Sequence, residues 1–163
     1  MKKNIIPFGN NQVKLRLIEH NDLSMTLNWR NDNDVRCWFK SSQIIPLENH
    51  LNWFKNYLLK ENDLLFIVES NGIPVGQAAV YNIDMIDRKA EIGRFIVSKS
   101  ESGKGHIFHA CKEIINFCKK DLNLNYLYLE VYERNLRARK LYLSLGFENE
   151  IQDGELIRMG LIL

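Results

Sequence analysis

Two segments of this chain, about thirty residues apart, hold residues whose types and spacing could bind an anion and move protons. In the first, the apolar stretch 91–97 leads into Ser102-Gly103-Lys104-Gly105. This order predicts a strand, a glycine turn and a helix, whose backbone N–H groups and dipole favour an anion such as a pyrophosphate. Taken alone the turn is weak evidence, because Gly-x-Gly before a helix more often serves backbone geometry than a ligand.

The second segment places Asn135 and Tyr142 seven residues apart in a short predicted helix that closes with Leu-Gly-Phe at 145–147. Seven residues are close to two helical turns, so both side chains face the same way. Each residue also has a structural alternative. Asn135 could be an N-cap, and Tyr142 could be a core aromatic.

The elements that must position these residues alternate between strand and helix patterns. Helices are predicted after an N-cap at 21–22, from Pro46 to near Lys60, through 107–118 and after Asn135. The predicted strands cover residues 13–17, 64–69, 74–81, 89–97 and 126–131, followed by a hairpin that turns at 153–154. The strands at 64–97 should form an antiparallel meander.

Composition fits one compact domain over residues 1–163, with 45% apolar and 26% charged residues. The formal charge of +2 does not favour nucleic acid as a partner, because binders usually concentrate basic residues on one face. No segment is long and apolar enough to span a membrane, and the run at 1–8 is too short for a signal peptide. Cys37, Cys111 and Cys118 lack C-x-x-C spacing, so we expect reduced core thiols, a cytoplasmic protein and no metal site.

Together, the two segments resemble the acetyl-CoA site of the GNAT superfamily of N-acetyltransferases. The order of elements matches that family from Val13 onward. The resemblance implies an α/β (α+β) GNAT fold with a mixed, mostly antiparallel central sheet of about seven strands and helices on both faces. It also implies acetyl-CoA as cosubstrate and a primary amine as acceptor. A homodimer is compatible with it, because many relatives pair through their C-terminal strands.

The resemblance carries over to the glycine turn residue by residue. The amides of Ser102 to His106 correspond to those that hold the CoA pyrophosphate, with Gly105 at the first Gly of the Arg/Gln-x-x-Gly-x-Gly/Ala pattern. Ser102 stands at the Arg/Gln position and Ile107 at the last Gly/Ala, so the sequence departs from the pattern at both. His106, at the helix N-terminus, could donate to a phosphate or could simply lie at the surface.

The same resemblance assigns the pantetheine arm of CoA to two other elements. The backbone of Phe95, Ile96 and Val97 corresponds to the strand that pairs with this arm. Asn135 corresponds to a residue that bonds the pantetheine region. Tyr142 corresponds to a candidate general acid near the thioester sulfur.

Amine acetylation also asks for a base, because a protonated amine must lose a proton before it attacks the thioester. Glu91 is the first candidate, since period-two counting along its strand puts it on the same face as Gly93, Phe95 and Val97. Glu130 on the next strand is the alternative. Either could be a solvated strand charge.

Aromatic and polar residues that could hold an acceptor gather in the N-terminal third: Trp29, Arg30, Asn31, His50 and Trp53. Aromatic faces suit a nucleobase or sugar ring, and Arg suits a diphosphate. Their order resembles that of GNAT enzymes, such as those of the pseudaminic-acid pathway, that acetylate the 4-amino group of a UDP-linked amino-deoxy sugar. The Trp-Arg-Asn triplet also occurs in related ribosomal-protein (RimJ/RimL-like) and antibiotic acetyltransferases, and at least one Trp is expected to be core.

Two classes of function follow. The first is an acetyl-CoA-dependent N-acetyltransferase, most simply one for a UDP-linked amino sugar and alternatively one for a protein N-terminus or a small amine. The second is a catalytically idle CoA-binding protein, which the departures at Ser102 and Ile107 suggest. The presence of Asn135 and Tyr142 favours the enzyme.

Overall fold

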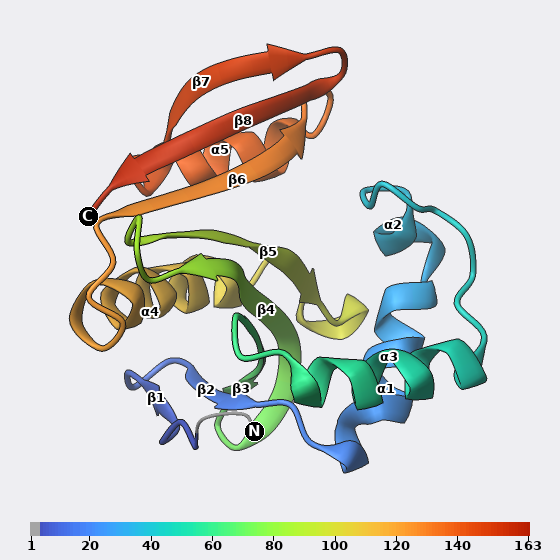
Figure 1. The fold of residues 1–163 in the computed structure, drawn as a ribbon. Helices are drawn as coiled ribbons and strands as arrows, with labels where there is room; N and C mark the ends of the chain where they lie inside the picture. Colours follow the sequence, from blue (N-terminus) through green and yellow to red (C-terminus); the bar gives the residue numbers. More distant parts are fainter. Residues whose placement is uncertain (1–3) are drawn as a thin grey trace.

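The computed structural model describes residues 4–163, so residues 1–3, where the segment considered as a signal peptide begins, lie outside the described residues. Within the described chain, eight strands form one sheet in the order β1-β2-β3-β4-β5-β6-β8-β7 (Figure 1). The strands are β1 (Phe8–Gly9), β2 (Lys14–Leu17), β3 (Asp63–Ser70), β4 (Ile73–Asp84), β5 (Lys89–Val97), β6 (Tyr126–Tyr132), β7 (Glu148–Asp153) and β8 (Leu156–Ile162). Neighbouring strands are antiparallel except β5 and β6. The predicted mixed, mostly antiparallel sheet is confirmed, and the two-residue β1 is too short to leave a sequence pattern.

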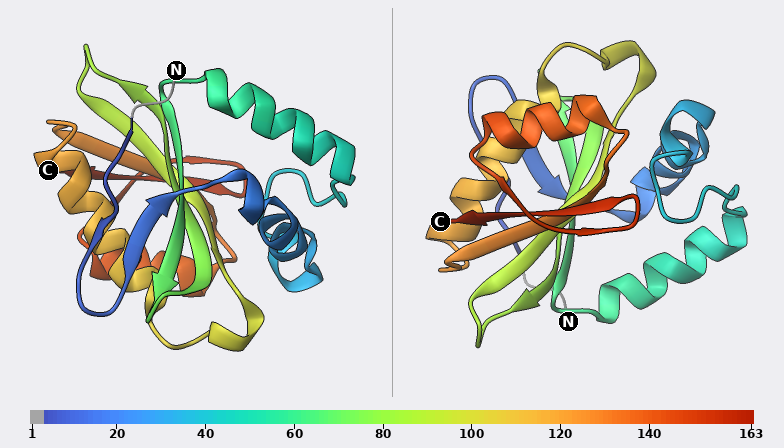
Figure 2. Two further views of the ribbon diagram at one scale, coloured as in Figure 1. Left: turned by 90° about the horizontal axis from the view of Figure 1, so that it is seen from below. Right: turned by 90° about the horizontal axis from the view of Figure 1, so that it is seen from above.

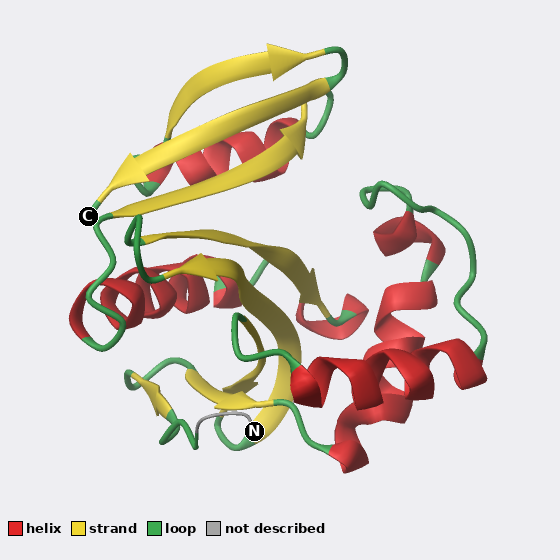
Figure 3. Cartoon of the chain, in the orientation of Figure 1, coloured by secondary structure: helices red, strands yellow, loops and turns green. Residues whose placement is uncertain are grey.

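Helices cover both faces of this sheet, as predicted (Figures 2 and 3). They are α1 (Leu23–Asn31), α2 (Asn33–Arg36), α3 (Leu47–Leu59), α4 (His106–Lys120) and α5 (Leu136–Ser144). The first three lie on one face, and α4 and α5 lie on the other. Because β3 is covered on both faces, its residues from Asp63 to Val68 are all buried.

Alternate residues of β3 belong to two separate hydrophobic cores. Phe66 packs into the larger core, which lies under α4 and α5 and includes Ile114. Leu65 and Ile67 pack into the smaller core, together with Phe54 from α3. This alternation follows from the pleat of the strand, and it fixes which face of the sheet each helix covers.

Two irregularities of β5 lie where the sheet opens. The parallel pairing with β6 covers only Lys89–Glu91, after which the two strands diverge (Figure 1). The pairing with β4 contains a bulge, because Ala79 lies opposite Gly93 while Gln77 lies opposite Ile96. Two residues of β5 therefore face one of β4, and Arg94 takes a left-handed φ of 52°.

The bulge corrects the expected face of Glu91. Residues directly opposite in a sheet share a face, and an extra residue reverses the alternation beyond it. Glu91 and Gly93 lie on the face of Tyr81 and the smaller core. Phe95, beyond the bulge, packs against the larger core on the opposite face, and Val97 opposes Gly76 there.

One expectation about the cysteines was also wrong. Cys111 and Cys118 are buried in α4 as predicted, but Cys37 is exposed after α2, with its Sγ 3.7 Å from the carbonyl oxygen of Asp34. Helix α2 has no buried residue, so a thiol beside it has no core to enter.

In the part of the chain that the structure describes, no helix is long and apolar enough to cross a membrane.

Candidate active site

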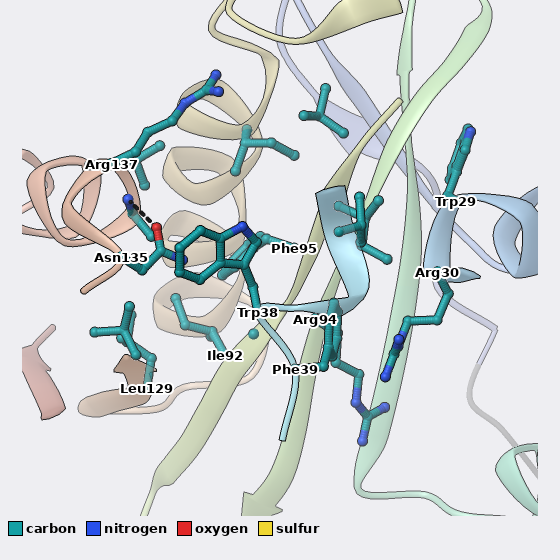
Figure 4. Close-up of a pocket in the computed structure, with 18 of the residues that line it drawn as sticks. Trp29, Arg30, Trp38, Phe39, Ile92, Arg94, Phe95, Leu129, Asn135 and Arg137 are labelled. Carbon is teal, nitrogen blue, oxygen red and sulfur yellow. Dashed lines mark hydrogen bonds between the residues drawn. The ribbon is translucent and has the colours of Figure 1, made fainter. Parts of the chain in front are cut away.

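A cavity of about 1190 Å³ opens where β5 and β6 diverge (Figure 4). Its walls are the divergent parts of these strands, the turn before α4, the cavity-facing side of α5 and the segment from α1 to residue 41. The sheet therefore opens beside both segments that the sequence singled out. The residues of the glycine turn, the helix with Asn135 and Tyr142, and Glu91 all border one space.

The glycine turn has the geometry of an anion-binding cradle. Gly103 and Gly105 have φ values of +85° and +82°, which non-glycine residues rarely adopt. A Cβ on Gly103 would meet nothing within 4 Å, so the space above the turn is open. Helix α4 begins at His106 with Gly105 as its N-cap, and no side chain caps its first amides. A phosphate fits such a turn, because the first-turn N–H groups of a helix need an acceptor.

The charged side chains of this turn are paired with one another. Glu101 accepts hydrogen bonds from Nζ of Lys104 at 2.9 Å and from Nε2 of His106 at 3.0 Å. These bonds, that of Lys104 first, lower the pKa of Glu101. The side chain of Lys104 is thereby held at Glu101, and Lys104 does not line the cavity, whereas Ser102 and His106 do. Ile107 lines the cavity as well and packs partly against the larger core.

Helix α5 presents Asn135 and Tyr142 to the cavity together, as their spacing predicts. Oδ1 of Asn135 accepts a hydrogen bond from the amide of Ala138 at 3.2 Å, so this residue caps the helix and borders the cavity at once (Figure 4). Tyr142 as a whole residue is 9% exposed, and its ring lies 6.0 Å from the ring of Phe95, centre to centre. Burial, and to a lesser degree Cys111 and Tyr81, raises the pKa of Tyr142. Its hydroxyl is therefore protonated at neutral pH and can donate a hydrogen bond.

Glu91 borders the cavity at the point where β5 leaves β6, and neutral donors hold its carboxylate. Oε1 accepts from the hydroxyl of Tyr81 at 2.7 Å, and Oε2 accepts from Nδ2 of Asn82 at 2.9 Å. Burial and the bond to Glu91 raise the pKa of Tyr81, so this hydroxyl remains a donor. The alternative base, Glu130, also borders the cavity but is paired with Nζ of Lys40 at 2.5 Å.

Sequence reasoning missed Tyr81, because only the β4–β5 register places it opposite Glu91. The guanidinium of Arg94 lies 4.2 Å from the centre of the Tyr81 ring, and Nη1 of Arg94 bonds Asp63 at 2.8 Å. Arg94 also lines the cavity. Strand alternation did not predict that Arg94 lies beside Tyr81, because the bulge at Arg94 changes the direction in which the Arg94 side chain points.

The predicted acceptor residues lie in three different places. Trp29 and Arg30 line the main cavity. His50 and Trp53 line a side chamber of about 270 Å³, which shares Arg30, Phe39 and Arg94 with the main cavity. Asn31 lines neither of these cavities, because its amide accepts from the N–H of Ile45 at 2.8 Å and donates to the carbonyl of Ile45 at 2.9 Å.

Arg30 combines a positive charge with incomplete pairing. Its Nη2 donates to the carbonyl of Ser41 at 2.6 Å, and the guanidinium lies 4.0 Å from the centre of the Phe39 ring. Within residues 4–163 its buried Nη1 has no hydrogen-bond partner. Burial lowers the pKa of Arg30, which still leaves the guanidinium charged at neutral pH.

His50 belongs to the packing of α3 against α1. Its ring stacks on Trp53 at 5.2 Å between centres, and Nε2 lies 3.3 Å from the hydroxyl of Thr26. Burial lowers the pKa of His50, so the neutral imidazole is the form that fits this site. The side chamber therefore has a largely aromatic and apolar wall beside the charged Arg30.

Comparisons with known proteins agree with this arrangement. Residues 12–148 match the family model of the acetyltransferase (GNAT) domain. Spermidine N(1)-acetyltransferase of Escherichia coli K12 is 32% identical over 146 residues, which is 89% of this chain and 76% of that protein.

Solved structures show the same fold. Spermidine N-acetyltransferase of Vibrio cholerae, in complex with CoA and spermine, has a TM-score of 0.85 at 24% identity, with 94% of this chain and 96% of that one covered. A dodecameric structure of a V. cholerae spermidine N-acetyltransferase is similar too. Apo FdhC, a nucleotide-linked sugar GNAT, has a TM-score of 0.83 at 19% identity, with 99% and 91% covered.

Proposed function

We propose, because this chain belongs to the GNAT acetyltransferase family, that its acceptor is the 4-amino group of a UDP-linked amino-deoxy sugar. The coarser function is that of the family: the protein is an N-acetyltransferase that transfers acetyl from acetyl-CoA to an amine. The observation that carries the proposed acceptor is the buried Nη1 of Arg30, which no group of residues 4–163 satisfies.

The pairing of the carboxylates in the cavity supports an anionic acceptor. The carboxylates that line it all accept hydrogen bonds from this chain: Asp32, Asp34, Glu91, Glu101 and Glu130. A polycation would have to compete with those donors, whereas a diphosphate would supply the acceptor that Arg30 lacks. Phe39, on whose ring Arg30 stacks, and Trp38, which lies towards Asn135 and Phe95, offer aromatic rings for a nucleobase or a sugar ring (Figure 4). FdhC, a nucleotide-linked sugar GNAT, shares the fold, which is therefore compatible with such an acceptor.

In this proposal, each reacting proton has a residue of the chain to take or give it. Acetyl-CoA supplies an activated acetyl group. Glu91 accepts the proton that the ammonium form of the amine loses before it attacks, and the hydroxyl of Tyr81 and the amide of Asn82 keep its carboxylate oriented. Tyr142 donates its proton to the sulfur as the carbon–sulfur bond breaks, and the second proton, which the nitrogen loses as the amide forms, restores the Tyr142 hydroxyl. The turn at Ser102 to His106 binds the pyrophosphate through its amides, while the backbone of 95–97 pairs with the pantetheine arm.

A small polyamine is a second candidate acceptor, favoured by the 32% identity with spermidine N(1)-acetyltransferase over most of this chain. For a cationic substrate, Glu91 and Glu130 would provide the counter-charge after Lys40 moves away from Glu130. The two candidates therefore differ in the residue on which binding depends. A nucleotide sugar depends on Arg30, and a polyamine depends on the carboxylates.

The test is release of free CoA thiol with UDP-linked 4-amino sugars, spermidine, peptides with free N-termini and an aminoglycoside. Arg30→Gln should raise the KM for the UDP-amino sugar on the order of tenfold, because a charged hydrogen bond to a buried group is lost. Arg36→Gln is the matched control. Arg36 donates to the carbonyl of Ser42 much as Arg30 does to that of Ser41, but it does not line the cavity.

The outcomes separate the candidates. Turnover of the UDP-amino sugar alone, impaired by Arg30→Gln and not by Arg36→Gln, supports the proposal. Turnover of spermidine alone, or equal effects of the two variants, contradicts it. If the protein binds acetyl-CoA but acetylates no amine of the panel, either it is a catalytically idle CoA-binding protein or its acceptor is an amine that the panel lacks.

The assembly and the location of the protein are also part of the proposal. The dodecameric V. cholerae relative supports a homo-oligomer for this chain. Three free cysteines, one of them exposed, suit a reducing compartment such as the cytoplasm. Light scattering of the purified protein would test the assembly directly.

A further inference from the structure

One cation faces the glycine turn from a different element. Arg137 lies in the first turn of α5, and its Nη1 is 3.3 Å from the hydroxyl oxygen of Ser102. Both residues line the main cavity. Figure 4 shows the Arg137 side chain extending from α5 towards α4. The turn thus has backbone donors on one side and a guanidinium on the other.

The lysines near the turn are already paired with carboxylates. Lys104 bonds Glu101, which the ring of His106 contacts as well, and Lys99 pairs with Asp34 at 3.1 Å. Within the described chain, Arg137 forms no ion pair, and its bond to Ser102 engages one of five N–H donors. An anion at the turn would therefore meet Arg137 as its available counter-charge.

We propose that Arg137 is a binding residue for the pyrophosphate of the acetyl donor, acting from α5 across the glycine turn. The inference rests on the proposed function, because it concerns the donor site of the same enzyme. The turn amides contribute dipoles, and Arg137 contributes a formal charge and a planar set of donors that suits two phosphate oxygens. Ser102 orients the guanidinium.

This contact also has a positional consequence. Arg137 shares a short helix with Asn135 and Tyr142, so a bond from Arg137 to the pyrophosphate ties that helix to one end of the donor. The hydroxyl of Tyr142 is then held at the other end, near the sulfur. Arg137 is thus a binding residue that also helps to position the candidate acid.

Calorimetric titration of CoA and of dephospho-CoA, which keeps the pyrophosphate but lacks the 3′-phosphate, tests the assignment. Arg137→Gln should weaken both by a similar factor, on the order of tenfold, and should reduce the salt dependence of binding. The Kd of Arg137→Lys should lie between those of the native protein and Arg137→Gln, because lysine keeps the charge but lacks the planar set of donors. Lys140→Gln, an exposed charge loss on the same helix that does not line the cavity, should leave the Kd unchanged.

Three results would overturn the proposal. These are an equal effect of Lys140→Gln, no effect of Arg137→Gln, or an effect on CoA without one on dephospho-CoA, which would place Arg137 at the 3′-phosphate. Acetyl-pantetheine has no phosphate, so its KM as acetyl donor should be the same for the native protein and for Arg137→Gln. Failure of every UDP-amino sugar while CoA binds normally would reject the proposed acceptor and leave the Arg137 result interpretable.

Discussion

At the scale of the residue, the two candidate proton carriers differ in how their surroundings hold them. Tyr142 is buried among aromatic rings, which keep its hydroxyl protonated. Glu91 accepts from Tyr81 and Asn82, neither of which carries a positive charge. The carboxylate of Glu91 thus has no cationic partner bonded to it, whereas that of Glu130 is bonded to the ammonium of Lys40. The pairing thus favours Glu91 over Glu130 as the base.

Replacement of these groups should separate catalysis from binding. Tyr142→Phe and Glu91→Gln should each lower kcat by about 10²-fold or more, because each removes a proton carrier while keeping the shape of the side chain. The Kd for acetyl-CoA should change little, as measured by calorimetry. Glu130→Gln is the matched control and should retain most of the activity. If Glu130→Gln were the slower enzyme, the assignment of the base would be reversed.

At the scale of the element, α3 packs against α1 through a buried neutral imidazole. His50 lies between Thr26 and Trp53, and burial lowers its pKa. The unfolded chain therefore binds a proton at His50 at a higher pH than the folded protein does. Its contribution to stability is complete above the ordinary histidine pKa of about 6.5 and is lost as the pH falls below that value.

A stability measurement against pH follows from this packing. The denaturation midpoint of the native protein should fall between pH 7 and pH 5, and His50→Gln should reduce this slope because the titrating group is removed. His20→Gln, at an exposed histidine, is the control and should keep the native slope. The carboxylate of Asp22 titrates at a lower pH. Burial opposes its ionisation, but the bonds from Arg16 and from the amide of Glu19 lower its pKa overall. An unchanged slope in His50→Gln would show that His50 is not held neutral.

At the scale of the whole molecule, the cavity lies between the part of the sheet formed by β1–β5 and the part formed by β6–β8. The two parts are joined through only three residue pairs between β5 and β6. The proposed donor-binding residues come from both parts, and the chain segment from α1 to residue 41, where the acceptor is proposed to bind, lines the opening from the side of α1–α3. The three thiols differ in exposure: Cys111 and Cys118 are buried in α4 against the sheet, whereas Cys37 is exposed.

Thiol modification should distinguish these environments. In the native protein we expect one cysteine per chain, Cys37, to react quickly with an aromatic disulfide reagent at neutral pH. Burial removes access to Cys111 and Cys118 and raises the pKa of both thiols, that of Cys118 to about 12. Unfolding in denaturant should expose all three, and Cys37→Ser should abolish the fast phase. Fast reaction of two or more thiols in the native state would contradict the packing of α4.

The sequence by itself determined the elements that carry the chemistry, because their signals are local. Alternation and turn residues placed β5 at 89–97, and an N-cap with a seven-residue spacing placed Asn135 and Tyr142 on one face of α5. Only the tertiary structure decided what these elements meet. The bulge at Arg94 moved Phe95 and Val97 away from the face of Glu91, and strand register brought Tyr81 to that carboxylate. Contacts such as Lys40 with Glu130 and Arg137 with Ser102 join residues 90 and 35 positions apart. No local pattern encodes such pairs, because they form only when strand pairing and helix packing have fixed the separate elements in space.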